Sequence, residues 1–222
     1  MTVTRSREGE AREAMLVAAT RLFAERGFEA TSFQDVATAV GVSKQAVLHY
    51  FASKGRLREA VLEAQVAHWH EALPRLLTAA TASEDRFEAV LGELVRFFTS
   101  DPHRARVVLR EALDRPAETK ALLKGPVKPW LAAVAGYITR GQRRGEHHAT
   151  LDPDAYVALM LELVIVACAS APLLDAAVGE GGRARVTGEL LRIARTALFL
   201  PKREGAAAPE AETRSARKKK MR

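Results

Sequence analysis

The sequence predicts an all-α protein, and three observations lead to that fold class. Apolar residues recur every three or four positions, residues that cap or end helices flank these segments, and no alternating β-branched stretch is long enough for a strand. The chain has 222 residues, of which 48% are hydrophobic and 27% charged. This composition is ordinary for a soluble globular protein and allows one large domain or two small ones.

A first helix, two short helices and a long fourth helix are expected over residues 8–26, 33–40, 44–51 and 54–77. Gly27 and Gly41 stand where the first and second helices end, as glycine often does. Ser53 is placed to cap the fourth helix, and Pro74 is expected to kink or end it.

Apolar patterns predict further helices over about 87–98, 103–114, 130–144, 154–174 and 183–200. Asp101 and Asp152 each precede a proline, which places a capping side chain before proline at the first helical position. Gly145 ends one of these helices, and residues 178–182 form a glycine-rich turn.

Residues 33–52 have the pattern of a helix-turn-helix. Ala37 is the small residue where the two helices touch, and Gly41 can adopt the left-handed conformation that the turn needs. Ser32 and Asp35 can form a capping box, and Ser43 can cap the second helix. An ordinary pair of packed helices is the alternative. It is disfavoured because every inward position fits: Val36, Val40, Val42, Val47 and Tyr50.

The outward face of the second short helix is short and mostly polar, which suits the major groove of DNA. Gln45 can form two hydrogen bonds with adenine, and the small apolar residues of this face can contact a thymine methyl group. Phosphate contacts are expected from Lys44, His49 and Lys54. The whole outward face is Lys44, Gln45, Ala46, Leu48 and His49.

Residues 27–54 closely resemble the DNA-binding segment of the TetR family of bacterial transcriptional regulators. The stretch Ala-x2-Leu-Phe-x-Glu-x-Gly over 19–27 and the spacing Leu57-x4-Leu62 resemble the family's first and fourth helices, so the resemblance covers about residues 8–63. By this resemblance, the residues at the DNA are Thr31, Ser32, Gln34, Ser43, Lys44, Gln45, Ala46, Leu48, His49, Tyr50 and Lys54.

Two positions depart from the family's pattern. Family members often have threonine where Ala46 stands and tyrosine where Leu48 stands, so two potential hydrogen bonds to DNA are missing. Gln45 occupies a position where glycine is common. We therefore expect Gln45 to supply part of the sequence specificity.

The resemblance also implies a C-terminal domain whose last two large helices pair with those of a second copy in a four-helix bundle. Apolar residues cover more than one face of the helix over 154–174, which indicates burial against its own domain and a partner. A helix central to a monomer is the alternative. The expected interface residues are Val157, Leu161, Val164, Ile165, Cys168, Leu190, Ile193, Ala194 and Ala197.

A cavity for a small molecule is expected among the helices between residues 54 and 160. Aromatic residues gather there although they are only 6% of the chain, which favours an apolar or aromatic effector. Each candidate has a plain core role as its alternative. The expected lining residues are Trp69, Leu73, Leu94, Phe97, Phe98, Val108, Trp130 and Tyr137.

No catalytic residue, metal site, cofactor or membrane span is expected. The common nucleotide-binding and hydrolase motifs are absent, and the single cysteine, Cys168, rules out a disulfide within the chain and a cysteine-clustered zinc site. The apolar stretch 155–174 is interrupted by Glu162 and contains Pro172. The first twelve residues lack the apolar segment of a signal peptide, so a cytoplasmic location is expected.

Charge alone does not indicate DNA binding, because five of the seven net positive charges fall in residues 201–222, which hold eight Lys or Arg and three Asp or Glu. We expect a DNA-binding domain over 1–53, an effector-binding and dimerisation domain over 54–200, and a disordered basic tail over 201–222. The resemblance implies a homodimeric repressor that a small molecule releases from a near-palindromic operator in double-stranded DNA, through a shift of the fourth helix. The alternative is a DNA-binding regulator that answers to a protein partner and has no small-molecule pocket.

Overall fold

The structure is a computed structural model that describes residues 2–79 and 83–201. Within these ranges the all-α fold class is confirmed, because no strand occurs there apart from an isolated bridge between His147 and Phe199. The described helices are α1 (Thr2–Arg26), α2 (Phe33–Val40), α3 (Lys44–Tyr50), α4 (Lys54–Ala79), α5 (Ser83–Ser100), α6 (Pro102–Asp114), α7 (Pro116–Lys124), α8 (Lys128–Arg143), α9 (Pro153–Ala169), α10 (Ala171–Val178) and α11 (Gly182–Leu198).

Two hydrophobic cores organise these helices. The first joins α1, α2 and α3 to the start of α4 and contains Phe23, Val36, Val47 and Leu57. The predicted domain boundary between residues 53 and 54 stays a prediction, and the first turns of α4 share the core of the preceding helices.

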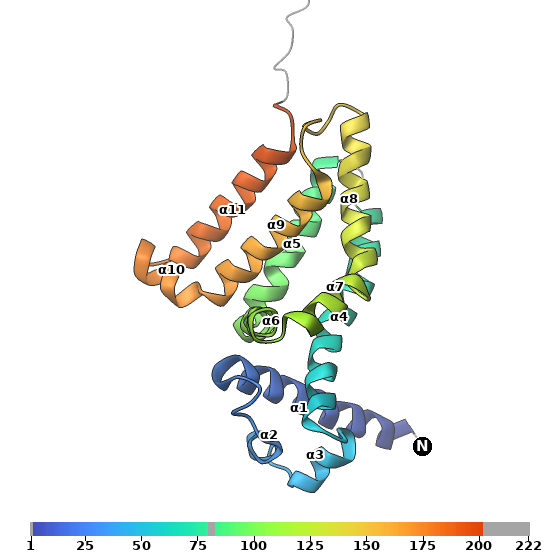
Figure 1. Ribbon diagram of the computed structural model, residues 1–222, viewed down its shortest axis with the longest axis vertical. Coiled ribbons are helices and arrows are strands. Elements are labelled where there is room, and N and C mark those ends of the chain that lie inside the picture. Colours follow the sequence, from blue (N-terminus) through green and yellow to red (C-terminus); the bar gives the residue numbers. More distant parts are fainter. Residues whose placement is uncertain (1, 80–82, 202–222) are drawn as a thin grey trace, which may run out of the picture.

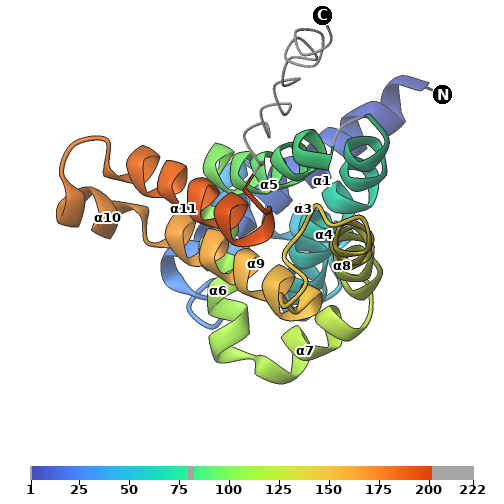
Figure 2. The same ribbon diagram turned by 90° about the horizontal axis from the view of Figure 1, so that it is seen from above.

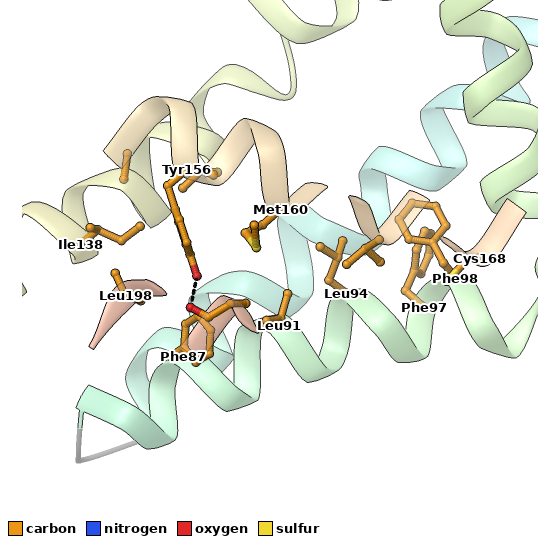
Figure 3. Close-up of a cluster of buried hydrophobic side chains, with 14 of the residues drawn as sticks. Phe87, Leu91, Leu94, Phe97, Phe98, Ile138, Tyr156, Met160, Cys168 and Leu198 are labelled. Carbon is orange, nitrogen blue, oxygen red and sulfur yellow. Dashed lines mark hydrogen bonds between the residues drawn. The ribbon is translucent and has the colours of Figure 1, made fainter. Parts of the chain in front are cut away.

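The second core lies among α5, α8, α9 and α11. In Figure 3 the side chains of Phe87, Leu91 and Leu94 on α5 face Tyr156 and Met160 on α9. The buried hydroxyl of Tyr156 donates a hydrogen bond of 2.7 Å to the carbonyl oxygen of Ala194 on α11. This bond joins the two helices at the centre of the core.

α4 and α6 connect the two cores. Figure 1 shows α1, α2 and α3 at one end of the molecule, with α4 rising from them beside α8 and α6 lying across the junction. Val107 of α6 is buried in the first core, whereas Ala105 belongs to the second. Seen from above, α10 and α11 lie on the side of the molecule opposite α8 (Figure 2).

Two helical segments differ from the prediction. The helix expected over 154–174 breaks at Ser170 into α9 and α10, which are bent by 76°. Pro172 accounts for the break, because proline has no N–H to donate and its ring displaces the preceding turn. α7 was not predicted. α4 continues through Pro74, so of the two effects expected of this proline, a kink or an end of the helix, the end is excluded. No single described helix is both long and apolar enough to cross a membrane, and only the bent pair α9 and α10 meets the length and composition together.

Candidate functional site

The helix-turn-helix forms as the residue pattern predicts. Val36, Ala37 and Val47 are fully buried between α1, α2 and α3. Gly41 has φ 72°, and the N–H of Val42 donates to the carbonyl oxygen of Ala37 at 2.9 Å, which closes the turn. The side chain of Val42 is the exception to the prediction, because it is 37% exposed.

Side-chain caps hold both short helices at their N-termini. The Ser32 hydroxyl accepts from the N–H of Asp35, and the Asp35 carboxylate accepts from the N–H of Ser32 at 2.7 Å, so the capping box is complete. Hydrogen bonds from the Ser32 side chain and backbone hold the pKa of Asp35 below its usual range. The Ser43 hydroxyl accepts from the N–H of Ala46 at 3.2 Å.

The exposed surface of α3 lies at the end of the molecule farthest from α5, α8, α9 and α11 (Figure 1). Of the residues predicted to face DNA, Ala46 is half-buried against the first core, and Tyr50 is half-buried with its ring edge-on to the His49 ring. The exposed members of the predicted set are Ser32, Gln34, Ser43, Lys44, Gln45, Leu48 and His49.

Two of the residues expected at the DNA have other roles in the fold. Thr31 is only 2% exposed, and its hydroxyl donates to the carbonyl oxygen of Gly27 at 2.9 Å, so it is not available to DNA. The ammonium group of Lys54 donates to the carbonyl oxygens of Phe28 and Glu29 at 2.9 and 3.1 Å. These bonds occupy two of its three N–H donors, so Lys54 ties α4 to the connection between α1 and α2.

A cavity of about 330 Å³ opens between the helices of the C-terminal part, within the size range of ligand sites. Six predicted residues line it: Trp69, Leu94, Phe97, Phe98, Val108 and Trp130. The rings of Trp69 and Trp130 meet edge to face with their centroids 5.5 Å apart. Tyr137 lines a separate cavity of about 50 Å³, and Leu73 is buried but lines neither of these two cavities.

Sequence reasoning missed one wall of the cavity and two of its polar side chains. Thr119, Leu122 and Leu123 come from α7, the helix that was not predicted. Gln65 and Glu111 also line the cavity. Gln65 lies four residues before Trp69 on α4, so its position on the same helical face was the available signal.

Comparisons with known proteins agree with the helix-turn-helix. Residues 15–61 match the family described as "Bacterial regulatory proteins, tetR family". The chain is 26% identical over 153 residues to the HTH-type transcriptional activator FasR of Mycolicibacterium smegmatis, which covers 69% of this chain and 70% of that protein. It is 29% identical over 171 residues to the HTH-type transcriptional regulator EthR of the same organism, covering 75% and 77%.

The chain belongs to the TetR family. It is a DNA-binding transcriptional regulator. The structure of the ketosteroid transcriptional regulator KstR2 of Mycobacterium tuberculosis has the same fold, with a TM-score of 0.68 and 17% identity over 86% of this chain and 95% of that one. A structure titled "Molecular basis for control of antibiotic production by a bacterial hormones" matches with a TM-score of 0.65 and 25% identity, over 86% and 98%.

In this TetR-family chain, the residues predicted at a dimer interface divide into three groups. Val157, Val164, Cys168 and Ala194 are buried inside the protomer and cannot reach a partner, which corrects their assignment. Leu161 and Ile165 line the cavity, and Leu190 packs half-buried on the second core. The remaining two, Ile193 and Ala197, are exposed.

Ile193 and four residues outside the predicted set form an exposed apolar face on α9, α10 and α11. Successive residues of a helix are rotated by about 100°, so a displacement of one or two positions moves a side chain from the core to the surface. We call this set the outer face: Leu159, Leu163, Val166, Leu173 and Ile193, which are 41–70% exposed.

A buried ion pair connects the cavity to the DNA-binding helices. The carboxylate of Glu111, which lines the cavity from α6, accepts a hydrogen bond of 2.8 Å from the guanidinium of Arg58 on α4. Both side chains are largely buried. The guanidinium of Arg58 also lies 5.5 Å from the ring centroid of Phe28, between α1 and α2.

Three cations surround that Phe28 ring. Lys54 and Arg58 approach it from α4, and Arg115 approaches it from the end of α6 with its guanidinium 4.5 Å from the ring centroid. Arg115 also pairs with Glu29. The connection between α1 and α2 is therefore held by α4 and by the end of α6, and both helices line the cavity.

Proposed function

We propose that this protein is a homodimeric repressor that binds a near-palindromic operator and is released when a small molecule enters the cavity. The observation that carries the proposal is the position of α6. Val108 and Glu111 of this helix line the cavity, whereas Val107 lies in the core of the DNA-binding helices. A change in the shape of the cavity therefore acts directly on the support of α3.

In the proposed complex, α3 enters the major groove. Gln45 is exposed and reads a base, and Lys44 and His49 contact phosphates. Ser32 and Ser43 stand at helix N-termini, where backbone N–H groups favour a phosphate. Because a bacterial operator lies in the cytoplasm, the proposed function implies a cytoplasmic location.

The proposed dimer forms through the outer face. Its apolar residues come from neighbouring helices. The outer face of one protomer would pack against the outer face of the other across a twofold axis, as in an isologous interface. Such a dimer presents two recognition helices to half-sites about 34–36 Å apart. One protomer alone would hold only a single half-site.

The proposed release works through differential affinity. A ligand can shift the protein only toward the conformation that it binds more tightly. Packing of a ligand against Glu111 moves the Arg58 side chain, because the two are joined by a buried hydrogen bond. Arg58 lies at the Phe28 ring together with Lys54 and Arg115, so the movement reaches the support of α2 and α3.

Control by a protein partner without a small-molecule pocket is the second candidate. That hypothesis requires a C-terminal part packed without a cavity. The cavity of about 330 Å³, lined mostly by apolar and aromatic side chains, favours the small-molecule hypothesis instead.

Selection of bound sequences from random duplex DNA tests the proposal. We expect a single near-palindromic motif from the purified protein at moderate salt. Gln45→Ala is then expected to relax the preference at one base pair per half-site, by about 1–3 kcal/mol of discrimination, without lowering affinity for unrelated DNA. Enrichment of no motif, or an unchanged motif with Gln45→Ala, contradicts the docking of α3 described above.

A further inference from the structure

We propose that the cavity takes an uncharged, largely apolar molecule that carries a hydroxyl or carbonyl group, and that it rejects carboxylates. This inference rests on the proposed function, because it names the chemical class of the effector. It comes from the charges and the unpartnered polar atoms of the described residues that line the cavity.

The charges of the lining exclude an anion. Among the described lining residues there are two carboxylates, Glu111 and Glu162, and no lysine or arginine. Glu111 is already paired with Arg58, whose guanidinium lies behind it and is itself largely buried. A carboxylate that entered would lose its hydration without gaining a cationic partner.

The polar atoms of the lining indicate what the ligand carries. The side-chain oxygens of Gln65 and Thr119 and the indole nitrogen of Trp130 are buried without a hydrogen-bond partner among the described residues. These side chains come from α4, α7 and α8, three helices that meet at the cavity. Buried polar atoms are normally hydrogen-bonded, so we expect a ligand in this cavity to supply hydrogen-bond partners for these three atoms.

The donors and acceptors of these three side chains favour a ligand that carries an oxygen atom. The indole N–H of Trp130 can only donate, so the ligand must offer an acceptor. The Thr119 hydroxyl can donate or accept, and the Gln65 amide can do either after rotation about its last bond. A ligand hydroxyl satisfies a donor and an acceptor together, whereas a ligand carbonyl satisfies the Trp130 and Thr119 donors.

The rest of the lining requires an apolar body. Leu62, Val66 and Leu122 contribute aliphatic surface, and Phe97 and Trp69 contribute aromatic rings that meet edge to face with centroids 5.3 Å apart. The Nε2–H of His70 donates to the Pro126 carbonyl oxygen at 3.1 Å, so this donor is not available to a ligand. The cavity therefore combines one small polar region with a large apolar one.

The chain contains its own probe for this cavity. It has two tryptophans, Trp69 and Trp130, and both line the cavity. Quenching of intrinsic tryptophan fluorescence therefore reports occupancy directly. We would titrate the full-length protein with decan-1-ol, decan-2-one, decanoate and decyltrimethylammonium, which share a ten-carbon chain and differ in the head group.

Decan-1-ol and decan-2-one are expected to bind at least about 10-fold more tightly than decanoate. Thr119→Val is expected to weaken binding of decan-1-ol about 5- to 10-fold, the effect of losing one hydrogen bond. Thr139→Val is the matched control. It makes the same chemical change on α8, where the threonine hydroxyl already donates to the Ala135 carbonyl oxygen at 3.0 Å outside the cavity lining, and it should leave the affinity unchanged.

Tighter binding of decanoate or of the ammonium compound than of decan-1-ol would overturn the inference, and so would binding of none of the four. An unchanged affinity in both Thr119→Val and Trp130→Phe would overturn the role of the polar atoms. Operator binding measured in parallel separates this result from the proposed function. If decan-1-ol binds without releasing DNA, the proposal of effector control fails and the proposed ligand class stands. If decanoate releases DNA, effector control stands and the proposed ligand class fails.

Discussion

Gly141 allows the end of α8 to pack against the buried ring of His147. A Cβ atom built on Gly141 would lie 2.1 Å from Nδ1 of His147, whose ring is 1% exposed and within hydrogen-bond distance, 3.0 Å, of the Ile138 carbonyl oxygen. The same ring packs edge-on against Tyr137 and Phe199. His147 is therefore a core residue that joins α8 to the end of α11.

Gly141→Ala is expected to lower the free energy of unfolding by about 1–3 kcal/mol, because the buried His147 ring cannot move away. Gly92→Ala in α5 is the control, since its Cβ would meet only the flexible end of Arg96 at 3.8 Å. That variant should be neutral or stabilised by roughly 0.5–1 kcal/mol. Denaturation in urea measures both, and equal stabilities would contradict the role given to His147.

The thiol of Cys168 should be unreactive in the folded protein. Burial in the second core raises the pKa of this thiol, and only the thiolate reacts with alkylating reagents. Because the folded pKa lies above the unfolded one, stability is unaffected below about pH 8.5 and falls as the pH rises beyond it. The rate of labelling with iodoacetamide between pH 7 and pH 9 should be set by the global unfolding that exposes the thiol. Fast labelling of the native protein would contradict the burial of Cys168.

At the scale of helices, the buried ion pair between Arg58 and Glu111 joins α4 to α6 beside the cavity. Removal of one partner leaves a buried charge, which costs about 3–5 kcal/mol, whereas apolar replacement of both is often neutral. Under the proposed function, we expect the pair to serve coupling between the cavity and the DNA-binding helices more than stability.

Arg58→Met combined with Glu111→Leu is expected to fold with nearly unchanged stability and to bind operator, while the effector loses most of its influence on operator affinity. The ratio of operator Kd values with and without decan-1-ol measures that coupling. Glu111→Gln alone is the contrasting variant, expected to be destabilised. A double variant that responds to the effector as strongly as the unmodified protein would show that coupling takes another route.

At the scale of the whole molecule, the outer face is the exposed apolar surface proposed to form the dimer. Leu163→Glu places a charge on the part of this face that α9 contributes. We expect a monomer whose affinity for a palindromic operator falls by at least about 100-fold, because both half-sites can no longer be held together. Leu113→Glu on α6 is the control, because Leu113 is 73% exposed and lies outside this face. Sedimentation and operator titration measure the two variants, and a dimeric Leu163→Glu would exclude the outer face.

The sequence by itself determined most of the helices, though not α7 or the break between α9 and α10, and it determined the helix-turn-helix of this protein. Caps at Ser32, Ser43 and Asp152, the turn at Gly41 and the apolar spacing are local features, and local hydrogen bonds and chain stereochemistry suffice to form them. Six of the eight predicted cavity residues were also recognisable, because they are large apolar side chains on neighbouring helices.

Only the tertiary structure decided which face of each helix is buried and which polar groups are paired. The inward turn of Thr31, the two carbonyl bonds of Lys54 and the outer face beginning at Leu159 all depend on neighbours distant in the chain. A nearly all-apolar helix such as α9 has no polar side to mark its exposed surface, so packing against α5, α6, α8 and α11 sets its rotation. The cavity also depends on tertiary packing, since it is the space that α4 to α9 leave between them.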